Sequence, residues 1–221
     1  MSEVTVATRD PNPMVRGEGI AVLIESGINV REGLLESEAK RQMQPFMHWC
    51  NHRRPLVTMK AALDANGCID GETPGRFTSE ESLVAAHRMR RHCDAIVVGV
   101  NTITRDNPRL DIRRIPLGQS RQPLRVVLDR NLRTPSDANV LSDGGNTILV
   151  HSTSNETGVA LPEGKDGADL GALLDHLGDR GIQELLVEGG ADVWRRFLDE
   201  ELIDRAIIIR SNIELEGGPK S

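Results

Sequence analysis

The sequence predicts an α/β fold in which helices flank a mostly parallel β-sheet. Short apolar runs typical of strands alternate along the chain with amphipathic patterns typical of helices. Several of these strand runs are continuously apolar, as in strands covered by helices on both faces. Polar residues also follow directly after individual strands, and ligand sites in open parallel sheets lie at the carboxyl ends of strands.

The elements follow one another in a βαβα order. The expected strands are residues 4–7, 56–62, 95–100, 124–129, 147–151, 184–188 and 205–210. The expected helices are residues 14–26, 37–51, 79–92, 170–178 and 191–200. The polar stretch around NHRRP separates the second helix from the strand at 56–62, so a domain boundary is predicted there, between residues 1–52 and 53–221. Residues 152–169 are rich in Gly and polar residues and are expected to form a surface excursion.

Composition excludes several classes of function. A formal net charge of −6 argues against a general nucleic-acid binder, which needs an excess of Lys and Arg. No apolar run approaches the roughly 18 residues of a membrane span, and the N-terminus lacks the pattern of a signal peptide. The three cysteines are widely spaced and form no CxxC pair, which favours reduced thiols and no metal site. We therefore expect a cytoplasmic protein that holds no metal and contacts neither nucleic acid nor membrane.

Four of the predicted strands end in polar or glycine residues. These are Asp64, Asn66 and Gly67; Asn101, Thr102 and Asp106; Asp129; and Glu188, Gly189 and Gly190. Because the carboxyl ends of parallel strands meet at one edge of a sheet, these residues predict a cleft.

The stretch LLVEGGADVWRRF has two possible interpretations. Gly189 and Gly190 lie between a strand and a helix, where glycine lets the backbone approach a ligand and helix N–H groups can hold an anion. A tight turn without a ligand explains the same pair equally well. The pair is not a GxGxxG fingerprint, so a Rossmann site is not indicated.

The helix at 79–92 places an arginine on its inward face. Residues 78–81, Thr-Ser-Glu-Glu, resemble a capping box that fixes the start of the helix. Helical periodicity puts Leu83, Ala86, His87 and Arg90 on one face and leaves Arg88 in solvent. A buried Arg90 needs a carboxylate or a phosphate as its partner, and the sequence leaves both open. Arg109, Arg113 and Arg114 offer a second anchor for phosphate or form a surface charge cluster.

The chain from about Arg54 onward resembles the reductase domain of riboflavin biosynthesis, which has a dihydrofolate-reductase-like fold. The matching stretches are RPLVTMKAALDANGCI, FTSEES, AIVVGVNTITRDNPRLDIR, RQPLRVVLDRNLRTP and LLVEGGADVWRRFLDEELID. The resemblance implies NADPH as cofactor and a phosphoribosylaminopyrimidine as substrate, whose ribosyl group is reduced to ribityl. It implies substrate contacts at Arg90, Leu110, Arg113 and Glu188. It implies cofactor contacts at Ala62, Thr102, Asp106, Gly190, Ala191, Asp192, Val193, Trp194, Arg195 and Arg196.

The preceding residues, 1–52, resemble the closing part of the deaminase domain that precedes this reductase in the bifunctional protein. The zinc-binding segments of that domain are absent from this sequence, so we expect neither zinc nor deamination. The family also continues beyond SNIELEGGPKS through further strands, which predicts an open sheet edge at strand 205–210. The resemblance further implies a homodimer.

The implied reaction is hydride transfer from NADPH to C1′ of 5-amino-6-(5-phosphoribosylamino)uracil. Arg130, just after the strand at 124–129, is a candidate for the 2′-phosphate of the cofactor. Two alternatives remain open at this point. One is a catalytically weak or inactive NADPH-binding relative, and the other is a different reductase of the same fold, acting on folate.

Overall fold

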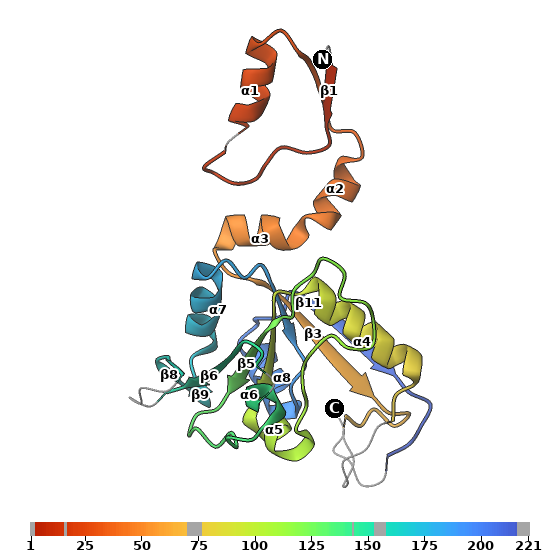
Figure 1. The fold of residues 1–221 in the computed structure, drawn as a ribbon, viewed down its shortest axis with the longest axis vertical. Helices are drawn as coiled ribbons and strands as arrows, with labels where there is room; N and C mark the ends of the chain where they lie inside the picture. Colours follow the sequence, from red (N-terminus) through yellow and green to blue (C-terminus); the bar gives the residue numbers. More distant parts are fainter. Residues whose placement is uncertain (1–2, 16, 70–76, 143, 153–157, 216–221) are drawn as a thin grey trace.

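The computed structural model describes residues 3–15, 17–69, 77–142, 144–152 and 158–215. A large α/β body carries a smaller N-terminal unit, and two helices connect them (Figure 1). None of the helices in these residues is long and apolar enough to cross a membrane. The predicted α/β fold class is confirmed.

One seven-stranded sheet forms the centre of the body, and every strand pairing within it is parallel. Its order is β11 (Arg205–Arg210), β3 (Leu56–Leu63), β10 (Glu184–Val187), β4 (Ala95–Gly99), β5 (Leu124–Leu128), β6 (Thr147–His151) and β7 (Val159–Ala160). Six of these strands match sequence predictions to within one or two residues. The apolar runs of the central strands β3, β10, β4 and β5 are buried because helices cover both faces of the sheet, whereas β11 at the edge is partly exposed.

Alternate residues of the central strands pack into two separate cores. Val97 of β4 lies in one cluster with residues of α7 (Leu170–Asp179) and α8 (Ala191–Asp199). Ile96 and Val98 lie in the other, with residues of α5 (Val100–Asp106) and the short helix α6 (Asn139–Ser142). Met89 of α4 (Glu80–His92) packs against this second cluster. Side chains of a strand point alternately to opposite faces, so β4 supplies both cores.

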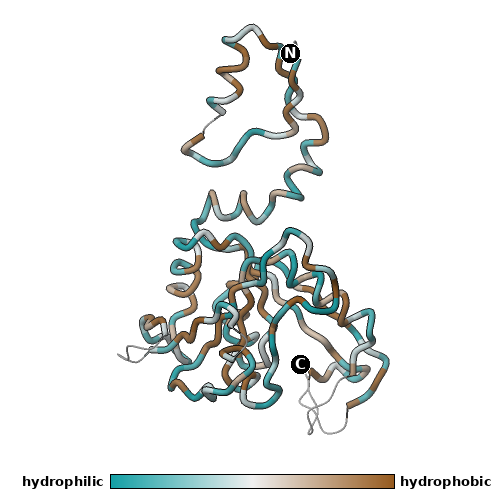
Figure 2. Tube along the Cα trace, viewed as in Figure 1, coloured by the Kyte–Doolittle hydropathy of each residue, from teal (hydrophilic) through white to brown (hydrophobic). Residues whose placement is uncertain are grey.

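The N-terminal unit contains two short parallel strands, β1 (Glu3–Val6) and β2 (Asn29–Glu32), and the helix α1 (Glu18–Glu25). Several large apolar side chains on it are exposed, including Val22 and Ile24 of α1 at 59% and 57%. Hydrophobic residues recur along this unit (Figure 2). The division at residues 52 and 53 stays a prediction.

Two helices, α2 (Glu36–Gln42) and α3 (Gln44–His52), lead from this unit to the sheet. The Trp49 indole of α3 donates a hydrogen bond to the Gly178 carbonyl at 2.8 Å. A Cβ atom at Gly178 would lie 1.8 Å from the Arg53 carbonyl oxygen, so only glycine permits this close packing of α7 against the chain after α3. The helix α3 is thereby fixed to the body.

Several expected boundaries were wrong for local backbone reasons. The predicted helix 37–51 is two helices that meet at Met43, because Pro45 lacks the N–H that would continue the hydrogen bonds of α2 and is tolerated only in the first turn of α3. The helix expected from residue 14 begins only at Glu18, after Gly17 adopts a φ of 76°. The helix α4 is capped by Ser79, whose hydroxyl accepts from the Ser82 amide at 3.2 Å, one residue later than the predicted capping box.

The segment 152–169 lies largely at the surface in its described part, as expected, but it contains regular structure. Residues 158–169 add β7 to the sheet and form a small antiparallel hairpin, β8 (Glu163–Gly164) and β9 (Gly167–Ala168). Gly167 and Ala168 are buried. Residues 153–157 of the predicted excursion, and 216–221 at the C-terminal end of the predicted second domain, lie outside the described residues.

Candidate active site

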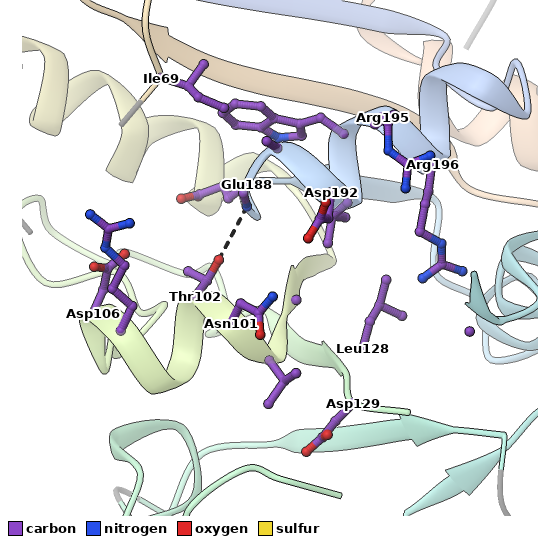
Figure 3. Close-up of a pocket in the computed structure, with 18 of the residues that line it drawn as sticks. Ile69, Asn101, Thr102, Asp106, Leu128, Asp129, Glu188, Asp192, Arg195 and Arg196 are labelled. Atoms are coloured by element: carbon purple, nitrogen blue, oxygen red, sulfur yellow. Dashed lines mark hydrogen bonds between the residues drawn. The ribbon is translucent and has the colours of Figure 1, made fainter. Parts of the chain in front are cut away.

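A cavity of about 1190 Å³ opens at the carboxyl ends of the central strands (Figure 3). It exceeds the usual range of roughly 300–1,000 Å³ for small-molecule sites, so it has room for a dinucleotide and a second ligand. Its polar lining includes residues from three of the four predicted strand ends: Asn101, Thr102 and Asp106; Asp129; and Glu188 and Gly190. The prediction that these strand ends share a cleft is confirmed.

The fourth strand end, after β3, does not line this cavity. Asp64 is 1% exposed, and its carboxylate accepts hydrogen bonds from the amides of Asn66, Cys68 and Leu215 at 2.6–2.9 Å. These bonds hold the pKa of Asp64 below its ordinary value. The expectation that Asp64, Asn66 and Gly67 join the cleft is therefore wrong, since Asp64 orders its own loop and the returning C-terminal segment.

The polar residues that follow β4, Asn101 to Asp106, lie in a helix rather than in a loop. The strand ends at Gly99 and Val100 begins α5, which stops where Asn107 adopts a left-handed φ of 40°. On α5, the Thr102 hydroxyl accepts a hydrogen bond from the Gly190 amide at 3.3 Å. This bond joins the start of α5 to the start of α8 across the cavity.

The two glycines before α8 have different steric roles. A Cβ atom at Gly189 would lie 2.6 Å from Val98 Cα, so the backbone of β4 leaves room only for glycine. A Cβ at Gly190 would meet nothing closer than the Thr102 hydroxyl at 3.6 Å. Gly190 is the N-cap of α8 and offers no side chain to the first-turn N–H groups, which suits an anion at this position.

Cationic side chains surround the opening beside α8. Arg130 pairs with Glu163 of the β8–β9 hairpin, and Arg195 with Asp166 at 3.3 Å. The guanidinium of Arg196 donates to the Ala168 carbonyl at 2.6 Å. Its Nε atom and the Trp194 indole nitrogen are buried without a hydrogen-bond partner in the described part of the chain. Buried donors of this kind normally have an acceptor, and a bound ligand would provide one.

Arg90 and Glu188 form a bidentate ion pair at the inner end of the cavity. Arg90 Nε and Nη2 each donate to a Glu188 oxygen at 2.7 Å, and the side chains are 13% and 7% exposed. Burial would raise the pKa of Glu188, but the charge and hydrogen bonds of Arg90, with the charge of Lys60, outweigh it and hold the pKa below its ordinary value. Of the two partners left open for Arg90, the structure contains the carboxylate.

Lys60 is a cavity residue that the sequence reasoning missed. It lies in β3 between Met59 and Ala61, lines the cavity, and is close enough to Glu188 to influence its pKa. The signal that could have identified it is the one charged residue in this strand, LVTMKAAL.

The remaining expected site residues divide into two groups. All of the residues expected at the cofactor line the cavity: Ala62, Thr102, Asp106, Gly190, Ala191, Asp192, Val193, Trp194, Arg195 and Arg196. Among the expected substrate residues, Glu188 lines it, whereas Arg90 reaches it through Glu188. Leu110 is 3% exposed with a left-handed φ of 51°, and its side chain packs in the core. Arg113 is exposed and pairs with Asp111.

A family model described as the RibD C-terminal domain matches residues 55–213. The chain belongs to this family. The riboflavin biosynthesis protein RibD of Aquifex aeolicus is 35% identical over 217 residues, which cover 94% of this chain and 60% of that protein. A 2,5-diamino-6-ribosylamino-4(3H)-pyrimidinone 5′-phosphate reductase of Methanothermobacter thermautotrophicus is 35% identical over 161 residues, covering 68% of this chain and 74% of that protein.

Solved structures of RibD proteins share the fold of the whole chain. A diaminohydroxyphosphoribosylaminopyrimidine deaminase/5-amino-6-(5-phosphoribosylamino)uracil reductase of Thermotoga maritima is 30% identical with a TM-score of 0.85. Acinetobacter baumannii RibD is 28% identical with a TM-score of 0.88. The matches cover 100% of this chain and 62% and 63% of those chains. The chain thus spans about three fifths of the length of these RibD relatives, and its dihydrofolate-reductase-like architecture is confirmed.

Proposed function

We propose that the chain reduces the ribosyl group of 5-amino-6-(5-phosphoribosylamino)uracil to ribityl in riboflavin biosynthesis, with NADPH as the reductant. One observation carries the proposal: a single cavity is lined both by the start of α8 and by Lys60 and Glu188, and Glu188 is paired with Arg90 behind it. The reductase name of the relative from Methanothermobacter thermautotrophicus supports the same assignment.

The residues around α8 fit NADPH. The Gly190 N-cap and the N–H groups that follow it suit the pyrophosphate. The buried Trp194 Nε1 and Arg196 Nε atoms have no hydrogen-bond acceptor among the described residues, and the bound cofactor would supply one. Arg130 and Arg195 supply positive charge for the 2′-phosphate, since each now pairs with an exposed carboxylate that a phosphate can replace. When bound, NADPH supplies the hydride.

The side chains at the inner end of the cavity orient the pyrimidine substrate. Glu188 has a lowered pKa and is therefore ionised, so it accepts hydrogen bonds from the substrate rather than donating a proton. Lys60 lines the cavity, so its ammonium group can donate a hydrogen bond to a substrate oxygen. Arg90 fixes the Glu188 carboxylate through both of its oxygens.

An NADPH-oxidation assay with the purified chain tests the proposal. Oxidation that depends on 5-amino-6-(5-phosphoribosylamino)uracil supports it. Binding of NADPH without turnover of this substrate would favour an inactive relative, and turnover of dihydrofolate instead would favour a different reductase of the same fold. Lys60→Met should lower kcat with little change in NADPH affinity, and Arg88→Met, on the exposed face of α4, provides the matched control.

A further inference from the structure

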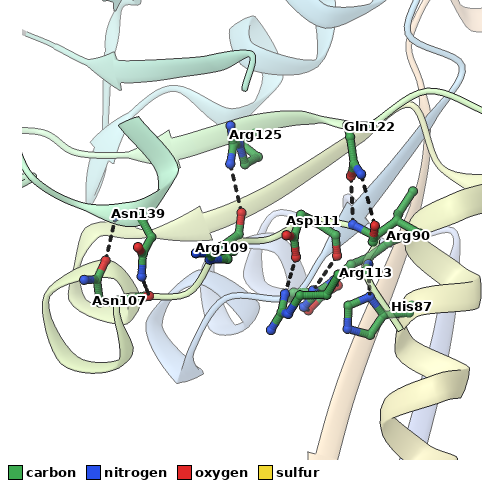
Figure 4. A network of polar contacts seen from close by, with 11 residues as sticks. His87, Arg90, Asn107, Arg109, Asp111, Arg113, Gln122, Arg125 and Asn139 are labelled. Atoms are coloured by element: carbon green, nitrogen blue, oxygen red, sulfur yellow. Dashed lines mark hydrogen bonds and ion pairs between the residues drawn. The ribbon is translucent and has the colours of Figure 1, made fainter. Parts of the chain in front are cut away.

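Side chains from α4 and β5, and one from the residues just before β5, hold the loop of residues 109–113 by its backbone (Figure 4). Gln122 contacts both the amide and the carbonyl of Ile112, at 2.7 and 3.1 Å. The guanidinium of Arg125 donates to the Arg109 carbonyl at 2.9 Å, and that of Arg90 to the Asp111 carbonyl at 3.2 Å. The loop is therefore built as a rigid piece beside the Arg90–Glu188 pair.

His87 makes the remaining contact of this kind, and it differs from the others in being titratable near neutral pH. Its side chain lies on α4, is 2% exposed, and accepts the Arg113 amide hydrogen at Nδ1, with an N···N distance of 3.3 Å. This bond requires Nδ1 to carry no proton. Protonation would turn Nδ1 into a donor that faces another donor, and the bond would be lost.

We propose that His87 is a positioning residue that, when neutral, holds the loop 109–113 in the geometry that receives the phosphorylated pyrimidine. Protonation of His87 releases the loop and weakens substrate binding in acid, while NADPH binding on the α8 side of the cavity is unchanged. This inference rests on the proposed function for its substrate, but the loop contact itself does not.

The charged groups around His87 favour its neutral form. Burial lowers its pKa first, and the charges of Arg90 on α4 and Arg113 on the loop lower it further. Asp111 on the loop and Glu188 after β10 act in the opposite direction but do not reverse the shift. Because the folded pKa lies below 6.5, the hydrogen bond is intact at pH 7 and is lost as the pH falls through the folded value.

Two variants separate the hydrogen bond from simple packing. In His87→Asn, the side-chain oxygen is the same number of bonds from Cα as Nδ1, so it can accept the Arg113 amide hydrogen and does not titrate. In His87→Leu, the volume is kept and the acceptor is lost. The KM for 5-amino-6-(5-phosphoribosylamino)uracil, kcat, and the Kd for NADPH are measured for each chain from acid to neutral pH.

His87→Leu should raise KM about three- to ten-fold above that of His87→Asn at all pH values, and above that of the wild type at neutral pH, as expected for one net hydrogen bond. The wild-type KM should rise in acid relative to that of His87→Asn, and the Kd for NADPH should be equal in all three chains. The ratio to His87→Asn matters because the substrate phosphate itself titrates near pH 6 and affects every variant alike. An unchanging wild-type to His87→Asn ratio across this range would overturn the proposal.

Hydrogen exchange of the Arg113 amide provides a readout that needs no substrate. At neutral pH, His87→Leu should exchange this amide faster than the wild type, while His87→Asn keeps its protection. Equal protection in His87→Leu and wild type would also overturn the proposal. If the exchange result holds but no chain turns over the pyrimidine, the proposed function fails and the role of His87 in holding the loop stands.

Discussion

At the scale of single residues, the Arg90–Glu188 pair has the strongest claim to a structural role. Replacing Arg90 by Leu would leave Glu188 buried and uncompensated, which typically costs about 3–5 kcal/mol. The double variant Arg90→Leu/Glu188→Leu should recover much of this loss, and Arg54→Leu, at the exposed Arg54–Asp175 pair, should cost at most about 1 kcal/mol. Urea unfolding measures all three; a double variant no more stable than Arg90→Leu would contradict this account.

The pH dependence of the same pair has a definite sign. The pKa of Glu188 is lowered on folding, so its contribution to stability is present above the unfolded value and decreases as the pH falls through the folded one. Stability of the wild type should thus fall more steeply in acid than that of Arg90→Leu/Glu188→Leu.

Arg113 is exposed, and its carboxylate partner on the same loop can be exchanged for a phosphate. Arg113→Ala should weaken substrate binding by roughly 1.5–3 kcal/mol through loss of a charge-assisted contact, with little effect on NADPH. The neighbouring Arg114, which pairs with Glu80 of α4, gives the control Arg114→Ala. Titrations of each variant with the substrate and with NADPH measure the two affinities. If Arg113→Ala weakens only NADPH binding, the loop 109–113 contacts the cofactor and not the substrate.

Arg130 provides the test of cofactor preference. If Arg130 binds the 2′-phosphate, Arg130→Ser should weaken NADPH by roughly 1.5–3 kcal/mol and leave NADH nearly unaffected. Arg121→Ser changes an exposed arginine that does not line the cavity and serves as the control. Equal affinities of the wild-type chain for NADPH and NADH would remove the basis of the prediction.

At the scale of elements, two adjacent glycines join β10 to α8, and we expect Gly189 to be needed for folding and Gly190 for cofactor binding. Gly189→Ala forces a Cβ against the backbone of β4 and should destabilise the chain by about 1–3 kcal/mol. Gly190→Ala meets only ordinary contacts, so the melting temperature should be unchanged while the added methyl group hinders NADPH. Thermal melts with and without NADPH distinguish the two, and equal melting temperatures for both variants would show that the steric argument is wrong.

Six strands of the seven-stranded sheet were predictable because their apolar runs are short and rich in β-branched residues, as in strands of a covered sheet, whereas β7, β8 and β9 have only two residues each and carry no such pattern. The helix α5 could not be predicted, since VNTITRD is short and its only apolar residues are Val100 and Ile103, too few to show a helical period. The strand β2, NVRE, is short and largely exposed, so no apolar pattern marks it.

The candidate site was predictable where residues follow strands directly. The sequence could not show that the Asp64 carboxylate accepts hydrogen bonds from backbone amides and so does not face the cavity. It also could not show that the hairpin carrying Asp166 folds back toward Arg195. Both depend on the spatial position of loops. Lys60 could have been predicted, because a charged side chain in a buried strand needs a polar partner or a ligand.

At the scale of the whole molecule, the body and the N-terminal unit differ in how their apolar surfaces are covered. The core of the body is closed by helices on both faces, whereas Met14, Leu34 and Leu35 of the N-terminal unit are 63–80% exposed. The unit is held to the body through α3 rather than through a shared core.

The sheet of the body also has one edge that invites association. The strand β11 is the last in the sheet order and pairs only with β3 among the described residues, so one side of its backbone is open. Ile208, in the middle of this strand, is 44% exposed. We therefore predict that the chain associates along β11, which would account for the expected homodimer.

A lysine on an edge strand opposes pairing, so Ile208→Lys should shift the chain toward the monomer without loss of NADPH binding. Ile24→Lys places the same charge on the exposed face of α1 and is the matched control for association through the N-terminal unit. Light scattering over a range of concentrations measures the mass of each. If Ile24→Lys alone lowers the mass, association runs through the N-terminal unit; if neither variant does, the open edge of β11 is not what brings two chains together.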